Sequence, residues 1–128
     1  MFEKRKFKRV EMYARGRAHD DSCDVDFGVI TRDITPEGIG ITAEFGPSPG
    51  DVLELKIDLE GQIIECQGKV SWIKKQTNHN NKDRFICGIK ITHIPYNYWS
   101  DLLKFYSRHV FKDFSFHDFL TNNTDFQH

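Results

Sequence analysis

Apolar and polar residues alternate along much of the chain up to residue 94, which is the two-residue period of half-buried β-strands. The clearest alternation lies at 52–59, where one face carries Leu53, Leu55, Ile57 and Leu59. Glu60-Gly61 follows this run and predicts a tight hairpin turn. By the same criteria we predict strands over residues 12–18, 25–34, 38–44, 52–58, 62–74 and 84–94.

After Pro95 the period changes from two residues to three or four, which predicts an amphipathic helix. We expect the helix to plug or flank the strands with a face that carries Trp99, Leu102, Leu103, Tyr106 and Val110. Short strands with no helix between them favour an antiparallel barrel or sandwich, and six of them favour a small closed barrel. The predicted fold is therefore mainly β, a six-stranded antiparallel β-barrel with a C-terminal α-helix.

The charges are divided unevenly along the 128 residues, a length that suits one domain. Residues 1–17 hold seven Lys/Arg and two Asp/Glu, a charge of +5. The whole chain has a net charge of −1, so the remaining residues total −6. A basic arm on a mildly acidic body suits a small anionic ligand. Duplex-binding proteins spread positive charge over a whole face, so we expect no DNA partner.

The sequence lacks the usual marks of a membrane-spanning, secreted or enzymatic protein. No run approaches the roughly 18 apolar residues that span a bilayer, and no apolar segment follows the N-terminal charges, so we expect a cytoplasmic protein without membrane insertion. An odd number of cysteines without C-x-x-C spacing indicates free thiols. The six histidines show no metal-ligand spacing and no catalytic motif is present, so we predict no metal, no cofactor and no enzyme.

Candidate ligand-binding chemistry lies first in the basic segment Arg5-Lys6-Phe7-Lys8-Arg9. Guanidinium groups bind phosphate with two parallel hydrogen bonds and stack on aromatic bases. In an extended segment Arg5 and Arg9 point to the same side, and Lys4 and Lys8 strengthen the positive field around them. The structural alternative is a solvated basic tail.

The second candidate is the segment Asp33-Ile34-Thr35-Pro36-Glu37-Gly38. As a hairpin turn it needs Asp33 and Thr35 to cap amides, proline to set φ, and Gly38 to supply a positive φ. As a ligand site it offers the Asp33 carboxylate, which can accept hydrogen bonds from a guanine edge. We expect both roles, with Ile34 pointing inward. Trp72 is either a core or barrel-rim aromatic or an apolar wall beside a bound base.

In this order the two segments resemble the signature of the PilZ domain, a bacterial cyclic di-GMP receptor module. Arg5 and Arg9 match its R-x-x-x-R segment, and Asp33, Thr35 and Gly38 match its [D/N]-x-S-x-x-G turn with threonine for serine. The resemblance covers roughly residues 4–108, continues through 68–72 and 85–91, and implies a split barrel. It also implies that Lys4, where an arginine accompanies an intercalated ligand dimer, favours one ligand or a weaker dimer.

We therefore expect a receptor whose arm, residues 1–10, is mobile alone and folds over cyclic di-GMP against a barrel at 11–95. A helix and Phe-rich extension at 96–121, either a second short helix or irregular in its last part, precedes a polar tail at 122–128. The extension is a candidate surface for a protein partner or homodimer through Phe114, Phe116 and Phe119. The alternatives are a PilZ-fold interaction module that no longer binds nucleotide and a small barrel that binds single-stranded nucleic acid.

Overall fold

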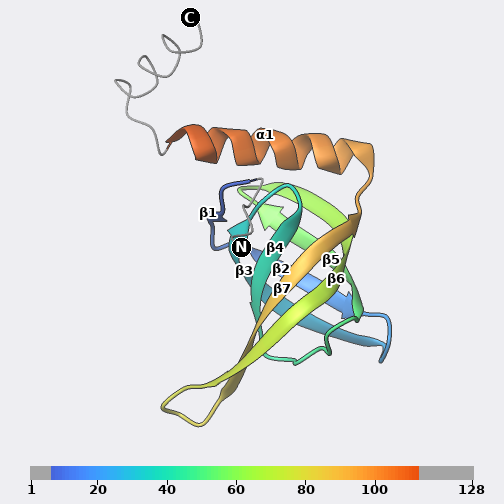
Figure 1. Cartoon of the computed structure of the whole chain (residues 1–128), viewed down its shortest axis with the longest axis vertical. Coiled ribbons are helices and arrows are strands. Elements are labelled where there is room, and N and C mark those ends of the chain that lie inside the picture. The colour runs from blue at the N-terminus through green and yellow to red at the C-terminus, as the bar shows by residue number, and fades with distance from the viewer. Residues whose placement is uncertain (1–6, 113–128) are drawn as a thin grey trace, which may run out of the picture.

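The computed structural model describes residues 7–112. Alternating and helical segments fall close to where the sequence pattern predicts them (Figure 1). The elements are β1 (Val10–Glu11), β2 (Arg15–Asp20), β3 (Val25–Ile34), β4 (Gly38–Ala43), β5 (Val52–Leu59), β6 (Gln62–Thr77), β7 (Asp83–His93) and α1 (Tyr96–Lys112). The predictions about Lys4, Arg5 and the phenylalanines after Lys112 lie outside the described residues.

The strands close into a barrel because each of β2 to β7 pairs with two neighbours, all antiparallel. The order β3-β2-β5-β6-β7-β4 is completed by the β3–β4 pair, and β1 extends one end of β3. The predicted six-stranded antiparallel barrel with a C-terminal helix is therefore confirmed. A closed barrel of this size is filled by its own side chains, so the ligand site is expected on its outside.

The core is the inward face of the alternating strands. In β5 every second residue is buried, and Leu53, Leu55, Ile57 and Leu59 are 0–2% exposed. Burying a leucine or isoleucine completely contributes roughly 1.5–3 kcal/mol, so this alternation fixes the register of the strand. Glu60 and Gly61 both have positive φ, 56° and 91°, which confirms the predicted tight hairpin between β5 and β6.

Helix α1 runs across one end of the barrel (Figure 1). Leu102, Phe105 and Tyr106 are its buried residues, with 1%, 2% and 9% of their surface exposed. Leu102 and Tyr106 are therefore buried as predicted. Leu103 was predicted to face the barrel as well, but it is only half-buried. Phe105 was missed, because the apolar residues at 102–106 form a nearly continuous run and their spacing alone does not choose the inner face.

Several strand boundaries differ from the prediction, and the predicted strand at 12–18 begins only at Arg15. Strand β2 continues through His19 and Asp20, which pair with Asp26 and Val25 of β3, so the predicted link does not begin at His19. Strands β6 and β7 extend to Thr77 and Asp83 as a two-stranded ribbon that projects beyond the barrel (Figure 1). Most residues of this ribbon are exposed on both faces, so no apolar alternation marks it.

The cysteines fit the expectation of free thiols. Cys66 and Cys87 are buried in the core, and burial raises the pKa of each thiol to about 11. Both therefore act as small core residues, because the reactive thiolate is not populated near neutral pH. Cys23 is free and exposed.

Candidate ligand-binding site

A groove of about 1470 Å³ lies on the outside of the barrel, where the N-terminal segment meets the end of β3, the β3–β4 turn and the faces of β6 and β7. It exceeds the roughly 300–1,000 Å³ of pockets for drug-sized ligands. Its cationic side chains come from four parts of the chain, and they are Arg9, Arg32, Lys74 and Lys90. An anion of nucleotide size or larger fits this groove by volume and by charge.

Asp33 reaches the groove because of an irregularity in β3. The β3–β4 register shifts between Thr31 and Asp33, as in a β-bulge, and Arg32 is the extra residue. The hydroxyl of buried Thr31 fixes this geometry by donating to the carbonyl of Met12 and accepting from the Ala14 amide. The bulge thereby turns the end of β3 so that Arg32 and Asp33 both line the groove.

The space for Asp33 is provided by its cross-strand partner Gly40. A Cβ atom at Gly40 would lie 2.7 Å from Asp33 Oδ1, so any larger residue would displace the carboxylate. Arg9 Nη1 lies 4.0 Å from Asp33 Oδ2, and their side chains are 46% and 28% exposed. Among residues 7–112, no hydrogen-bond donor lies closer to the Asp33 carboxylate than Arg9 does. The lone pairs of this carboxylate are therefore accessible to a ligand.

The Thr35 hydroxyl has a structural role. It accepts hydrogen bonds from the amides of Glu37 and Gly38, at 3.1 and 3.0 Å, while the Thr35 amide donates to the Gly38 carbonyl at 2.9 Å. Ile34 is completely buried, as predicted. Thr35 thus caps amides of the turn, as predicted for a hairpin, and it also lines the groove.

The reason predicted for Gly38 is wrong. The positive-φ glycines in the described part of the chain are Gly50 and Gly61, not Gly38. Instead, a Cβ atom at Gly38 would lie 2.7 Å from the backbone oxygen of Ile89 in β7. Glycine is required there because two backbones approach closely, a tertiary contact that the turn motif does not reveal.

Trp72 lines the groove and is not a core residue, which leaves the barrel-rim aromatic and the apolar wall beside a base as its two predicted roles. Its side chain is 45% exposed, and it lies against Gly88, where a Cβ atom would be 2.1 Å from the indole Nε1. Lys74 lies two residues further along β6 and also lines the groove. Sequence reasoning missed Lys74, although a two-residue step from Trp72 could have found it. Trp99 of α1 lines the same groove.

Three further cations, Arg32, Arg84 and Lys8, differ in their position relative to the groove. Arg32 lines the groove, whereas Arg84 lies 3.8 Å from Glu44 and does not. The backbone of Lys8 is held by α1, because the Tyr106 hydroxyl donates to the Lys8 carbonyl at 2.6 Å. Lys8 does not line the groove, so we keep for it only the predicted role of adding positive charge nearby.

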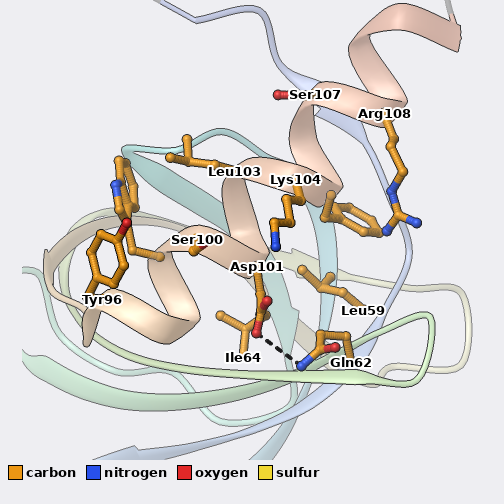
Figure 2. A pocket seen from close by; sticks show the side chains of 12 residues that line it. Leu59, Gln62, Ile64, Tyr96, Ser100, Asp101, Leu103, Lys104, Ser107 and Arg108 are labelled. Carbon is orange, nitrogen blue, oxygen red and sulfur yellow. Dashed lines mark hydrogen bonds between the residues drawn. The ribbon is translucent and has the colours of Figure 1, made fainter.

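A second groove, of about 910 Å³, lies between α1 and the β5–β6 hairpin (Figure 2). Leu59, Ile64 and Leu103 supply its apolar wall, and the Gln62 amide donates to Asp101 at 3.1 Å across it. It contains no residue of the two sequence motifs. Lys104 and Arg108 also line it, together with Asp101, so this groove combines an apolar wall with charges of both signs.

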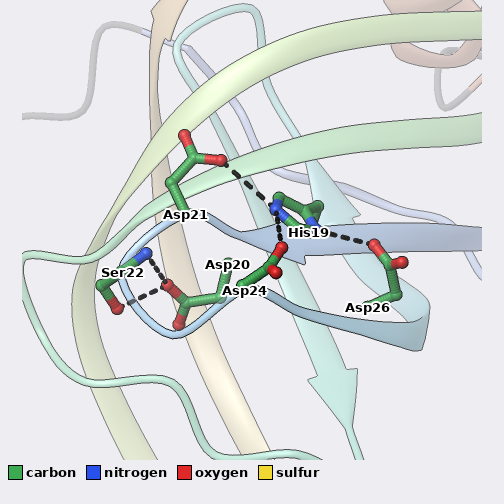
Figure 3. A network of polar contacts seen from close by, with 6 residues as sticks. All are labelled: His19, Asp20, Asp21, Ser22, Asp24 and Asp26. Atoms are coloured by element: carbon green, nitrogen blue, oxygen red, sulfur yellow. Dashed lines mark hydrogen bonds and ion pairs between the residues drawn. The ribbon is translucent and has the colours of Figure 1, made fainter.

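A polar network surrounds His19 at the β2–β3 turn (Figure 3). His19 Nδ1 lies 2.8 Å from Asp26, and Nε2 lies 3.3 Å from Asp24 and 3.7 Å from Asp21. The hydrogen bond to Asp26 and the surrounding carboxylates raise the pKa of His19 above its ordinary value. His19, Asp21 and Glu54 place ligand atoms within 4.8 Å of one another, although their sequence spacing gave no sign of it. A protonated imidazole already accounts for these contacts.

The fold and groove define a class of protein, a small closed β-barrel with a groove on its outside that Arg9, Arg32, Lys74 and Lys90 line. The model of the PilZ domain family matches residues 3–108, and the chain belongs to this family. No curated protein sequence matches significantly. None of the helices within residues 7–112 is long and apolar enough to cross a membrane.

Solved structures with the same fold have low sequence identity to this chain. The PilZ domain of YcgR from Escherichia coli, solved with c-di-GMP, aligns with a TM-score of 0.67 and 9% identity, over 87% of this chain and 95% of that one. MrkH of K. pneumonia in its apo state aligns at 0.71 with 12% identity, over 88% and 54% of the two chains. Bacillus subtilis MotI/DgrA, an inhibitor of motility, aligns at 0.66 with 18% identity, over 87% and 53%. The chain thus spans about half of the last two proteins.

Proposed function

We propose that this protein is a receptor for cyclic di-GMP. The observation that carries the proposal is the pair Arg9–Asp33, 4.0 Å apart on the wall of an open cationic groove. Arg9 supplies a guanidinium for a phosphate or a base face, and Asp33 supplies an acceptor for the guanine edge. The E. coli YcgR PilZ domain, solved with c-di-GMP, has the same fold and supports this assignment.

Other residues have supporting roles in the proposed site. Trp72 provides an aromatic wall beside a base, and stacking on such a surface is worth roughly 1–3 kcal/mol per base. Thr35 and Gly38 shape the turn that presents Asp33. Arg5 is proposed as the second phosphate-binding arginine, with Lys4 adding positive charge, as the family motif implies.

Phe7, Lys8 and Val10 already contact α1 and β3, so the proposed response is closure over the ligand of the arm that precedes Phe7, which changes a surface that a protein partner recognises. A receptor of this kind performs no chemistry, and the proposed location is the cytoplasm. One bound ligand or an intercalated pair both remain compatible with a groove of about 1470 Å³.

The test is calorimetric titration of the purified protein with cyclic di-GMP, GMP, GTP and cyclic di-AMP. We expect a Kd between roughly 0.1 and 50 µM for cyclic di-GMP, a binding free energy of about −6 to −10 kcal/mol, with weaker binding of the other three. Absence of heat and of competition at about 100 µM ligand would refute the proposal.

A second candidate is an interaction module that has lost nucleotide binding. The observation in its favour is the apolar wall of the groove between α1 and the β5–β6 hairpin, beside Tyr96, which is 82% exposed. A contiguous apolar surface on a small domain commonly marks a contact site. The same titration separates the candidates, because only the receptor binds cyclic di-GMP.

A further inference from the structure

The N-terminal segment is fastened to the C-terminal helix immediately before it enters the groove. The hydroxyl of Tyr106 donates to the Lys8 carbonyl at 2.6 Å, and the Phe7 ring meets the Tyr106 ring edge-on with centroids 6.0 Å apart. Tyr106 is only 9% exposed, and burial raises the pKa of its phenol. A buried hydroxyl needs a partner, so this hydrogen bond selects one position for the segment.

Arg9 is consequently held on both sides. The Lys8 carbonyl before it is bound by Tyr106, and Val10 after it is buried and pairs with Ile34 in the β1–β3 ladder. The backbone of Arg9 is therefore fixed relative to Asp33, which lies in the same two-residue ladder opposite Glu11. Only the rotamers of its side chain remain to be ordered by a ligand, and such preorganisation reduces the entropic cost of binding.

We propose that Tyr106 is a positioning residue of the nucleotide site, which sets Arg9 from outside the groove and couples α1 to the ligand. This inference rests on the proposed function and deepens it. Tyr106 itself does not line the groove, so its effect passes through the Lys8 peptide. Because coupling is reciprocal, a ligand that holds Arg9 also stabilises the docking of α1 on the barrel.

The same helix supplies a matched control. The hydroxyl of Tyr98 donates to the Glu65 carboxylate at 2.5 Å, a contact with β6 that does not involve the N-terminal segment. Tyr98 does not line the groove either. Tyr106→Phe and Tyr98→Phe each remove one hydroxyl from α1 and keep the ring, but only the first removes a hydrogen bond to the segment that carries Arg9.

The experiment is calorimetric titration with cyclic di-GMP of the wild type and of four variants, Tyr106→Phe, Tyr98→Phe, Arg9→Ala and the double variant Arg9→Ala/Tyr106→Phe. We expect Tyr106→Phe to raise Kd about 3- to 10-fold, the range for one hydrogen bond, and Tyr98→Phe to change it less than about twofold. In the Arg9→Ala background, Tyr106→Phe should add less than about twofold, because the side chain that it positions is gone. Equal Kd values for the two single variants, or the full penalty in the Arg9→Ala background, would overturn the proposal.

Amide hydrogen exchange distinguishes a positioning role of Tyr106 from a purely structural one, because only a positioning role makes the protection of α1 depend on the ligand. Cyclic di-GMP should slow exchange in the two turns of α1 around Tyr106, residues 103–110, in the wild type and in Tyr98→Phe, but not in Tyr106→Phe. If Arg9→Ala abolishes measurable binding, the double variant gives no Kd, and hydrogen exchange then tests whether Tyr106 couples α1 to the ligand. Ligand-induced protection that persists in Tyr106→Phe refutes the coupling alone, whereas a wild type that does not bind refutes the receptor assignment as well.

Discussion

Strand β3 carries a carboxylate–cation pair near each end, and the two pairs differ in how completely they are satisfied. Near the C-terminal end, Asp33 faces Arg9 at 4.0 Å on the wall of an open groove. Near the N-terminal end, Asp26 lies 2.8 Å from His19, whose other ring nitrogen lies 3.3 Å from Asp24. The two carboxylates are roughly 20 Å apart along the strand.

The difference shows that the densest cluster of charges is not the best candidate for a ligand site. Both ring nitrogens of His19 already have carboxylate partners (Figure 3), so an arriving ligand would have to replace them. Arg9 and Asp33 are separated by more than a normal hydrogen bond, and their remaining donors and acceptors stay accessible. The acidic β2–β3 turn would also repel the anionic ligand that we propose for the groove.

The largest effect is expected at the floor of the groove. Gly38→Val should lower the free energy of unfolding by about 2–3 kcal/mol, because its side chain would meet the Ile89 carbonyl oxygen in β7. The fall in Tm should be roughly 10 °C or more for a domain of this size. The matched control is Gly28→Ala in β3, where a Cβ atom meets nothing within 4 Å and the change should stay within about 0.5 kcal/mol. Equal Tm values for the two variants would show that this close approach is unimportant.

The next effect concerns the open pair itself. Arg9→Ala should cost about 1.5–3 kcal/mol of cyclic di-GMP binding, the scale for hydrogen bonds to charged groups. Asp33→Ala should lower affinity and also reduce the preference for guanine over adenine dinucleotides. Both should leave the Tm of the unliganded protein nearly unchanged, because an exposed ion pair at 4.0 Å contributes little to stability. A large fall in that Tm would instead make the pair a structural contact and remove its contrast with the His19 network.

A smaller loss of affinity is expected from the aromatic wall. Trp72→Ala should weaken binding by roughly 1–2 kcal/mol through lost stacking. Trp72→Phe should recover most of it, since an aromatic face over Gly88 is restored. Calorimetry on both variants measures the difference. Equal losses for alanine and phenylalanine would show that the base does not stack at this position.

The sequence revealed those features of the barrel that depend on near neighbours. Alternation in β5 predicted its buried face, and Glu60-Gly61 predicted a turn that needs positive φ at both residues. The Asp33–Gly38 motif likewise predicted which side chains meet at one turn, because all of them lie within six residues.

What the sequence did not reveal comes from contacts between distant segments. The constraint on Gly38 is set by Ile89, and the Tyr106–Lys8 hydrogen bond joins residues 98 apart. The His19 network likewise combines β2, the turn after it, β3 and Glu54 of β5, so no local spacing could mark it. Such contacts depend on how the barrel closes, which the alternation alone does not specify.

The smallest effect is expected at the closed pair, and it should depend on pH. The pKa of His19 is raised in the folded protein above 6.5, so its ion pairs stabilise the fold fully below pH 6.5. This contribution is lost as the pH rises through the folded-state pKa. Asp26→Asn removes the main partner and should therefore destabilise the protein below pH 6.5, while the two proteins converge at higher pH.

Urea unfolding of wild type and Asp26→Asn at about pH 5.5, 7 and 9 measures this difference in stability. The same substitution at the other end of the strand, Asp33→Asn, is the control. It should weaken cyclic di-GMP binding without changing how stability varies between about pH 6 and 9, whereas Asp26→Asn should do the reverse. If Asp26→Asn weakened ligand binding as much as Asp33→Asn does, the two ends of β3 would be coupled, and the division into a closed ionic network and an open ligand site would be wrong.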